Sequence, residues 1–121
     1  MTNSHKSVLI VEDEKPLAGA LKLKLEHEGF LVTLAVTGQE CVDLCSTRHF
    51  DVILLDLIMP AMDGFQVLEW LQEQPNPPTV FVISNLSQPE DEERVRKLGA
   101  QKFFVKSDTP LTKIVDEVQK V

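Results

Sequence analysis

The sequence of 121 residues has no run of apolar residues that could cross a lipid bilayer. A membrane-spanning helix needs about 20 predominantly apolar residues, and no run here comes near that length. The first seven residues also lack the apolar core of a signal peptide. Two cysteines are too few for a disulfide scaffold. Together these absences predict a reduced, cytoplasmic protein.

Basic residues are also few, since 12 Lys and Arg against 19 Asp and Glu give a net charge of −7. Nucleic acids and anionic membranes attract positive protein surfaces, so we expect neither to bind this domain. The length leaves room for one domain over residues 1–121. A hydrophobic content of 43% is enough for a real core, and 26% of charged residues is ordinary for a globular protein.

What the chain does contain is a regular alternation of short apolar runs and longer amphipathic stretches. We predict strands over 8–11, 31–36, 51–55, 79–83 and 102–105, and helices over 15–28, 39–48, 64–74, 89–98 and 109–120. Strands that alternate with helices form a parallel sheet with helices on both faces. The continuous apolar run at 52–55 fits a central strand that is covered on both sides. The predicted fold class is therefore α/β, a doubly wound parallel sheet.

Local signals mark several helix ends. Gly29 is placed to end the first helix, and Asp63 is placed to cap the helix over 64–74. Asp13 is a candidate cap for the first helix, and Glu14 is expected to be only a favourable first-turn charge there.

Polar or charged residues stand where four of the apolar strands end, namely Glu12-Asp13, Asp56, Ser84 and Lys106. The carboxyl ends of parallel strands meet at one edge of a sheet, where open α/β proteins bind their ligands. Two unit charges about 4 Å apart repel by roughly 4 kcal/mol at an effective dielectric near 20, so clustered carboxylates need a cation or a raised pKa. Mg²⁺ suits such oxygen ligands.

These groups together indicate phosphoryl chemistry. A carboxylate beside Mg²⁺ can attack phosphorus and form an aspartyl phosphate. The ammonium of Lys106 would balance charge on the phosphoryl oxygens, and the hydroxyl of Ser84 would donate a hydrogen bond to one of them. An Asp after an apolar strand is also a common turn former or helix cap. The combination of Asp56 with Asp13 and Lys106 favours the functional interpretation.

The segment LLDLIMPAMDG at 54–64 stands between the acid pair and the later Ser84, Gly99 and Lys106. In order and spacing these positions resemble the receiver domain of two-component response regulators, the CheY-like family. The resemblance runs from about residue 7 to residue 120 and rests on five separated functional positions. It implies a flavodoxin-like (βα)5 fold whose five parallel strands lie in the order 2-1-3-4-5.

The resemblance also implies a role for each residue of the pocket. Asp56 would accept the phosphoryl group, and Lys106 would hold it. Mg²⁺ would be bound directly by Asp13, by Asp56 and by the backbone carbonyl of Ile58, and through a water molecule by Glu12.

Two further residues would act as the switch. Ser84 would move toward the phosphoryl group and Phe103 would change its rotamer, which shifts a pre-existing equilibrium. The surface formed by helix 89–98, strand 102–105 and helix 109–120 would repack and become the output.

The implied phosphoryl donor is a sensor histidine kinase or a histidine phosphotransfer protein. The implied downstream target is another protein or a fused effector domain. The sequence leaves open whether the chain is a stand-alone regulator or part of a longer protein. Such a domain transfers the group onto its own Asp56 and turns over no separate substrate. We therefore do not expect a conventional enzyme.

Two other function classes remain as alternatives. A receiver-like module that binds partners without phosphorylation usually lacks the acid pair or the lysine, and this chain keeps both. An enzyme on a similar fold would be a flavodoxin-like protein or an aspartyl-phosphate phosphatase. Acids follow the first strand instead of a phosphate-binding loop, and Ile58 stands where the phosphatases carry a second Asp.

The chain departs from the family pattern at two positions. Asn85 follows Ser84 where a small residue, often Ala, is usual, so its amide would contact the phosphoryl group or crowd the attacking water and alter the dephosphorylation rate. Ser107 follows Lys106 where the family commonly has a proline after a cis bond. A cis bond before Ser costs about 3 kcal/mol, so we predict a trans bond.

One other cluster has residue types that bind metals. Cys41, Cys45 and His49 share a face of the helix predicted over 39–48, with spacing i, i+4 and i+8. A zinc site would lack a fourth ligand and the usual close cysteine pair. Thiols packed against the sheet are the expected role.

Overall fold

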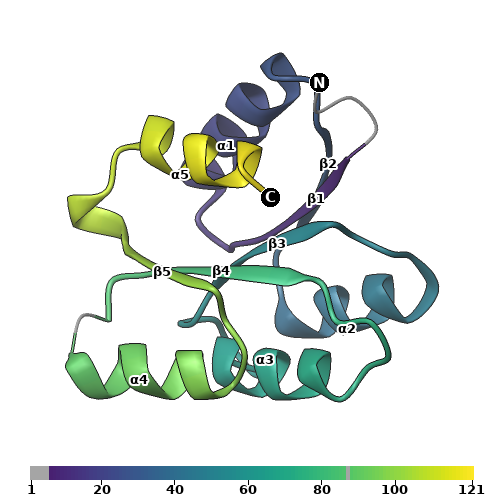
Figure 1. The fold of residues 1–121 in the computed structure, drawn as a ribbon, viewed down its shortest axis with the longest axis vertical. Coiled ribbons are helices and arrows are strands. Elements are labelled where there is room, and N and C mark those ends of the chain that lie inside the picture. Colours follow the sequence, from purple (N-terminus) through teal and green to yellow (C-terminus); the bar gives the residue numbers. More distant parts are fainter. Residues whose placement is uncertain (1–5, 87) are drawn as a thin grey trace.

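Five parallel strands alternate with five helices in the computed structural model, which describes residues 6–86 and 88–121 (Figure 1). The strands are β1 (Ser7–Val11), β2 (Leu31–Ala35), β3 (Val52–Asp56), β4 (Thr79–Ser84) and β5 (Lys102–Val105). The helices are α1 (Lys15–His27), α2 (Gly38–Thr47), α3 (Gly64–Gln72), α4 (Pro89–Lys97) and α5 (Leu111–Gln119), with a short 3-10 helix η1 (Lys106–Asp108) before α5. The predicted elements are confirmed to within two residues at each end.

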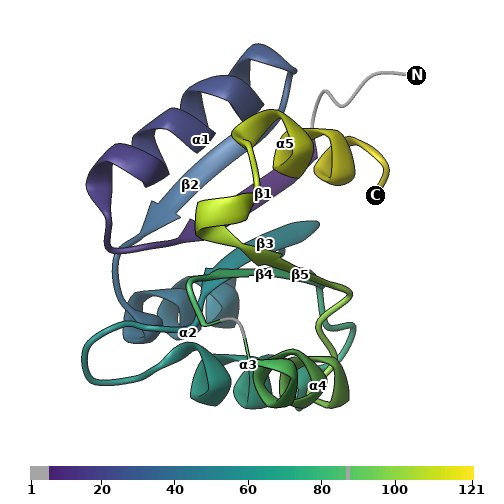
Figure 2. The same cartoon turned by 90° about the vertical axis from the view of Figure 1, so that its left-hand side faces the viewer.

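The strands lie in the order β2-β1-β3-β4-β5, and every neighbouring pair is parallel. Figures 1 and 2 show α1 and α5 on one face of the sheet and α2, α3 and α4 on the other. This is the doubly wound α/β fold that the sequence predicts. All five residues of the central strand β3 are buried, as the continuous apolar run indicates.

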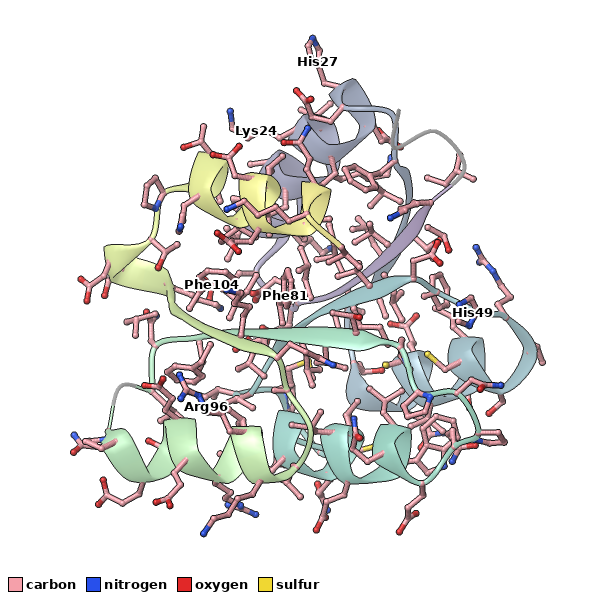
Figure 3. The ribbon with its side chains drawn as sticks, in the orientation of Figure 1. Lys24, His27, His49, Phe81, Arg96 and Phe104 are labelled. Atoms are coloured by element: carbon pink, nitrogen blue, oxygen red, sulfur yellow. The ribbon has the colours of Figure 1, made fainter. Side chains whose placement is uncertain are left out.

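Alternation along the strands divides the core into two layers. In β1, Val8 and Ile10 point toward α1 and α5. Leu9 and Val11 point toward α2, α3 and α4. Complete burial of such a side chain stabilises the fold by about 1.5–3 kcal/mol. Phe81 and Phe104 pack edge to face between the sheet and α5, with ring centroids 6.0 Å apart (Figure 3). A shift of one residue in any strand would turn these side chains toward the wrong layer.

The predicted ends of two helices are confirmed. Gly29 follows α1 with a φ of 97°, a left-handed conformation that glycine adopts without a steric penalty. Asp63 caps α3 by accepting a hydrogen bond from the backbone of Gln66, and the Gln66 side chain accepts one from the backbone of Asp63 in return. This reciprocal capping box fixes the loop between β3 and α3.

One expected helix cap is wrong, and one helix begins later than predicted. Asp13 does not cap α1, because Glu14 occupies the cap position and no side-chain bond is made there. The last helix begins at Leu111, two residues later than predicted, after the turn of η1. Thr109 is extended with φ −121° and ψ 114°. The ring of Pro110 disfavours a helical conformation of the preceding Thr109, so the helix begins only after the proline.

No helix in the described parts of the chain has both the length and the apolar character needed to span a membrane.

Glu117 is an unexpected ionic centre on α5. Its side chain is only 8% exposed, and its carboxylate lies 3.0 Å from Lys113, 3.2 Å from Lys120 and 3.3 Å from Lys102 of β5. Hydrogen bonds to Lys113, then to Lys120 and Lys102, lower the pKa of Glu117 to about 2. This carboxylate therefore ties β5 to α5.

We expect Glu117→Gln to lower the urea midpoint at pH 7, because three ammonium groups would then face one another without a carboxylate between them. The folded-state pKa lies below the ordinary value of 4.5, so the contribution of the carboxylate is complete above that value and is lost as the pH falls toward 2. Urea denaturation between pH 7 and pH 2 should show the difference between native and variant shrinking over the acidic part of that range. Glu69→Gln, at an exposed position of α3, is the control. Equal midpoints for native and Glu117→Gln at pH 7 would contradict the expectation.

Candidate functional site

Three carboxylates meet at the carboxyl edge of the sheet. Glu12 and Asp13 follow β1, and Asp56 ends β3, which is the neighbour of β1. One oxygen from each carboxylate lies within 4.8 Å of the others, and Asp13 is exposed to solvent. In residues 6–86 and 88–121 this is the one group of acidic, histidine or cysteine side chains with the spacing of a metal site. Such a set of hard oxygen donors fits Mg²⁺.

Lys106 reaches into the same pocket from the end of β5. Its Nζ lies 2.9 Å from a carboxylate oxygen of Glu12 and 3.3 Å from Oδ2 of Asp56, although the three residues are far apart in sequence. The side chains of Glu12 and Asp56 are 4% and 3% exposed. Because buried charges need partners, this ammonium is what makes the buried acid pair tolerable.

Burial dominates the electrostatics of the two acids in the pocket. Burial raises the pKa of Glu12 to about 7, against the opposing hydrogen bonds from the backbone of Glu14 and from Lys106. Burial also raises the pKa of Asp56, although the charge of Lys106 acts the other way. Burial alone would lower the pKa of Lys106, but hydrogen bonds to Glu14 and Glu12 outweigh it, and the pKa is raised. One ammonium does not neutralise all of these acids, so a divalent cation fits the site.

Backbone groups hold the two buried acids in place. The N–H of Ile58 donates to Oδ1 of Asp56 at 3.2 Å, and the N–H of Glu14 donates to Oε2 of Glu12 at 3.0 Å. Asp56 thus keeps Oδ1 on the backbone and turns Oδ2 toward Lys106, whereas Oε2 of Glu12 accepts hydrogen bonds from both the backbone of Glu14 and Lys106. The side chain of Ile58 is 54% exposed beside Asp56, and its carbonyl stays a predicted metal ligand.

The predicted switch residues lie on the strands next to the pocket. Ser84 ends β4, is fully buried, and accepts a hydrogen bond from the N–H of Leu86 at 3.1 Å. Phe103 lies on β5, half-buried against the core layer beneath α4. Asn85 is exposed and lines a cavity of about 270 Å³ together with Lys106. The roles proposed for these residues stay predictions.

Glu14 is the site residue that the sequence reasoning missed. The expectation of a mere first-turn charge is wrong, because its carboxylate lies 2.5 Å from Nζ of Lys106. It reaches across from the start of α1 to the end of β5. Three consecutive acids after a strand are the available signal, but the start of a helix is a sufficient explanation for the third of them.

Two remaining expectations are confirmed. The described residues contain no cis peptide bond, so the bond between Lys106 and Ser107 is trans. Cys41 is fully buried and packs in the core with the partly buried Cys45. His49 points outward at the surface beyond α2, where its side chain is 68% exposed (Figure 3). The arrangement is that of packed thiols and not of a zinc site.

Gly64 sets the distance between the pocket and α3. A Cβ at this position would lie 2.5 Å from the carbonyl oxygen of Asp56 and 2.5 Å from Cα of Leu57. The N–H of Gly64 donates to the carbonyl of Leu57 at 2.9 Å. Only a residue without a side chain allows α3 to begin this close to the end of β3.

A family model for the response regulator receiver domain matches residues 8–119. The chain belongs to this family. Receiver domains are the switches of two-component signalling, and those of response regulators interact with histidine kinases or other phosphodonors. This chain combines the receiver-domain fold with the acidic pocket and Lys106.

Similar proteins agree with this assignment. This chain is 33% identical over 99 residues to the response regulator ArlR of Staphylococcus aureus. The aligned part covers 82% of this chain and 45% of ArlR. The chain thus spans about half the length of the curated relatives it matches. The Francisella response regulator 1452 receiver domain is 30% identical with a TM-score of 0.88, covering 94% of this chain and 93% of that one. The receiver domain of a histidine kinase from Syntrophus aciditrophicus is 32% identical with a TM-score of 0.85, covering 95% and 88%.

Gly64→Ala should destabilise this receiver domain by about 1–3 kcal/mol, because the added methyl group overlaps backbone atoms that cannot move aside cheaply. Gly19→Ala is the matched control, since nothing lies within 4 Å of a Cβ at that position inside α1. This control should stabilise the helix by roughly 0.5–1 kcal/mol. Urea unfolding of both variants measures the two effects, and a Gly64→Ala variant as stable as native protein would contradict the geometry.

Proposed function

We propose that Asp56 accepts a phosphoryl group from a phosphohistidine donor and that the phosphorylated chain is the active signalling state. The observation that carries the proposal is the contact of one ammonium, Nζ of Lys106, with the buried carboxylates of both Asp56 and Glu12. These residues come from three strands that are separate in the sequence. A structural ion pair would need only one acid, whereas phosphoryl transfer needs a nucleophile, a cation and neighbouring acids.

In the proposed step a carboxylate oxygen of Asp56 attacks phosphorus. The bond between phosphorus and the imidazole nitrogen of the donor breaks, and the histidine leaves with the electron pair. The hydrogen bond from Ile58 to Oδ1 orients the carboxylate, which leaves Oδ2 on the side of Lys106. Lys106 then holds the phosphoryl oxygens through charge-assisted hydrogen bonds.

Mg²⁺ bound at this site would neutralise charge on the acids and on the phosphoryl oxygens. Asp13, Asp56 and the backbone carbonyl of Ile58 are the proposed direct ligands, and Glu12 is proposed to act through a water molecule. The cluster of carboxylate oxygens within 4.8 Å supports this assignment. The exposure of Asp13 leaves a route by which the ion can enter.

The signal would pass from the pocket through Ser84 and Phe103 to the surface formed by α4, β5 and α5. Ser84 is the last residue of β4 and Lys106 directly follows the neighbouring β5, so a shift of either residue affects the same part of the sheet. A sensor histidine kinase or a histidine phosphotransfer protein is the proposed donor. A downstream protein or a fused effector domain is the proposed target.

The described residues fit one receiver domain, because a single sheet takes in all five strands. We propose that it acts as a switch and not as a conventional enzyme, since the only group it would modify is its own carboxylate. The net charge of −7 supports the further proposal that it binds neither nucleic acid nor anionic membranes directly. A phosphorylation-independent module is not favoured, because the acids and the lysine are in direct contact.

Incubation with a small acyl phosphate and Mg²⁺ should add one phosphoryl group to the native protein, as measured by intact mass. Asp56→Asn should abolish the adduct, because an amide is not a nucleophile of this kind. Removal of Mg²⁺ by a chelator should prevent its formation. Asp43→Asn, at an exposed position of α2, is the control and should be modified like native protein. An adduct that persists in Asp56→Asn would show that the acceptor lies elsewhere.

Asn85→Ala should shorten the lifetime of the phosphorylated form. The exposed Asn85 lines the cavity beside Lys106, and its amide would narrow the path of the attacking water. The measurement follows the loss of the phosphoryl mass after the donor has been removed. Equal lifetimes for native and variant proteins would refute a role for Asn85 in dephosphorylation.

A further inference from the structure

Lys106 makes contact with three carboxylates at once. Its Nζ lies within 3.3 Å of oxygens from Glu12, Glu14 and Asp56. An ammonium group has three N–H donors and no acceptor, so these three contacts use its full capacity. A phosphoryl oxygen can bind Lys106 only if one of the present partners withdraws.

The three partners differ in how easily they can withdraw. The side chains of Glu12 and Asp56 are 4% and 3% exposed, and each also accepts a backbone hydrogen bond. Glu14 is 57% exposed, and its carboxylate makes no cap bond to α1. Because a charge that leaves Lys106 must be hydrated, only Glu14 can turn away into water at small cost.

Charge gives a second reason for this displacement. The pocket already holds Glu12, Asp13 and Asp56 close together, with Glu14 at its rim. A phosphoryl group brings a further charge of about −1.5 to −2. Glu14 therefore repels the incoming group while it occupies the cation that the group requires.

We propose that Glu14 is a resident competitor of the phosphoryl group for Lys106. In the resting protein its carboxylate takes the third N–H of the ammonium, and it turns toward solvent when Asp56 is phosphorylated. Glu14 is thus a positioning residue that holds Lys106 in place and slows modification by anionic donors. This inference rests on the phosphoacceptor role proposed above for Asp56.

The test compares Glu14→Gln with Glu26→Gln. Both changes remove one negative charge from an exposed glutamate, at the N-cap of α1 for Glu14 and within α1 for Glu26, but Glu26 pairs with Lys22 at 3.2 Å. The initial rate of adduct formation with a small acyl phosphate and Mg²⁺ is followed by intact mass at low and at high salt. In this reaction Asp56 displaces the carboxylate of the donor from phosphorus.

Glu14→Gln should raise the initial rate roughly two- to fivefold at low salt, the range expected for one exposed charge pair. High salt should reduce the difference, because it screens the repulsion. Glu26→Gln should keep the native rate. Glu14→Gln should also bind beryllofluoride, a phosphoryl mimic that forms no phosphate bond, at a lower half-saturating concentration in an NMR titration.

Several outcomes would overturn the proposal. If Glu14→Gln has the native rate and the native beryllofluoride affinity, Glu14 does not compete for Lys106. If Glu26→Gln accelerates the reaction as much as Glu14→Gln does, the acceleration comes from the change in net charge and not from loss of the contact between Glu14 and Lys106. A slower Glu14→Gln would mean that Glu14 assists the reaction. In each case a normal adduct on native protein leaves the role of Asp56 intact, whereas no adduct on native protein removes both proposals.

Discussion

The site depends on one ammonium group that lies between two buried carboxylates. Glu12 and Asp56 are buried side by side, and each would be strongly unfavourable without a positive partner. Lys106 supplies that partner from the end of β5, two strands away from β3 in the sheet. The acid pair and the lysine can meet only if β1, β3, β4 and β5 all keep their order and direction.

That order is maintained by packing well away from the pocket. Each strand points alternate side chains into one of two core layers. Both β1 and β3 contribute buried side chains to each layer. At the pocket itself, the capping box of Asp63 and the close approach at Gly64 fix the loop that follows Asp56. The position of the Asp56 carboxylate is thus set by strand β3 before it and by the fixed loop after it. It does not depend on the ion pair with Lys106 alone.

The sequence predicts the parts of this arrangement that short-range patterns determine. Element order, the strand-end positions of Asp56 and Lys106, and the cap at Asp63 follow from periodicity and turn chemistry within a few residues. Glu14 and Glu117 were missed for a common reason: only the tertiary fold brings Lys106 to Glu14 and Lys102 to Glu117. The local signals, a run of three acids at Glu14 and the neighbouring Lys113 and Lys120 at Glu117, are also typical of solvated surface charges. The roles of Phe103 and Asn85 concern a second state of the molecule, and neither pattern nor resting geometry defines that state.

Burial differs sharply among the strands, and this difference bears on how a switch can operate here. Strand β3, which carries Asp56, is buried along its whole length, whereas β5 is an edge strand in which Phe104 is the one buried residue. Segments with fewer buried contacts open and shift at lower free energy. Lys106 joins this edge strand to the buried β3 through its contact with Asp56, and Glu117 ties the same edge strand to α5. A change of charge at Asp56 therefore acts, through Lys106, on an edge strand with few buried side chains, while β3 itself is held by burial along its whole length.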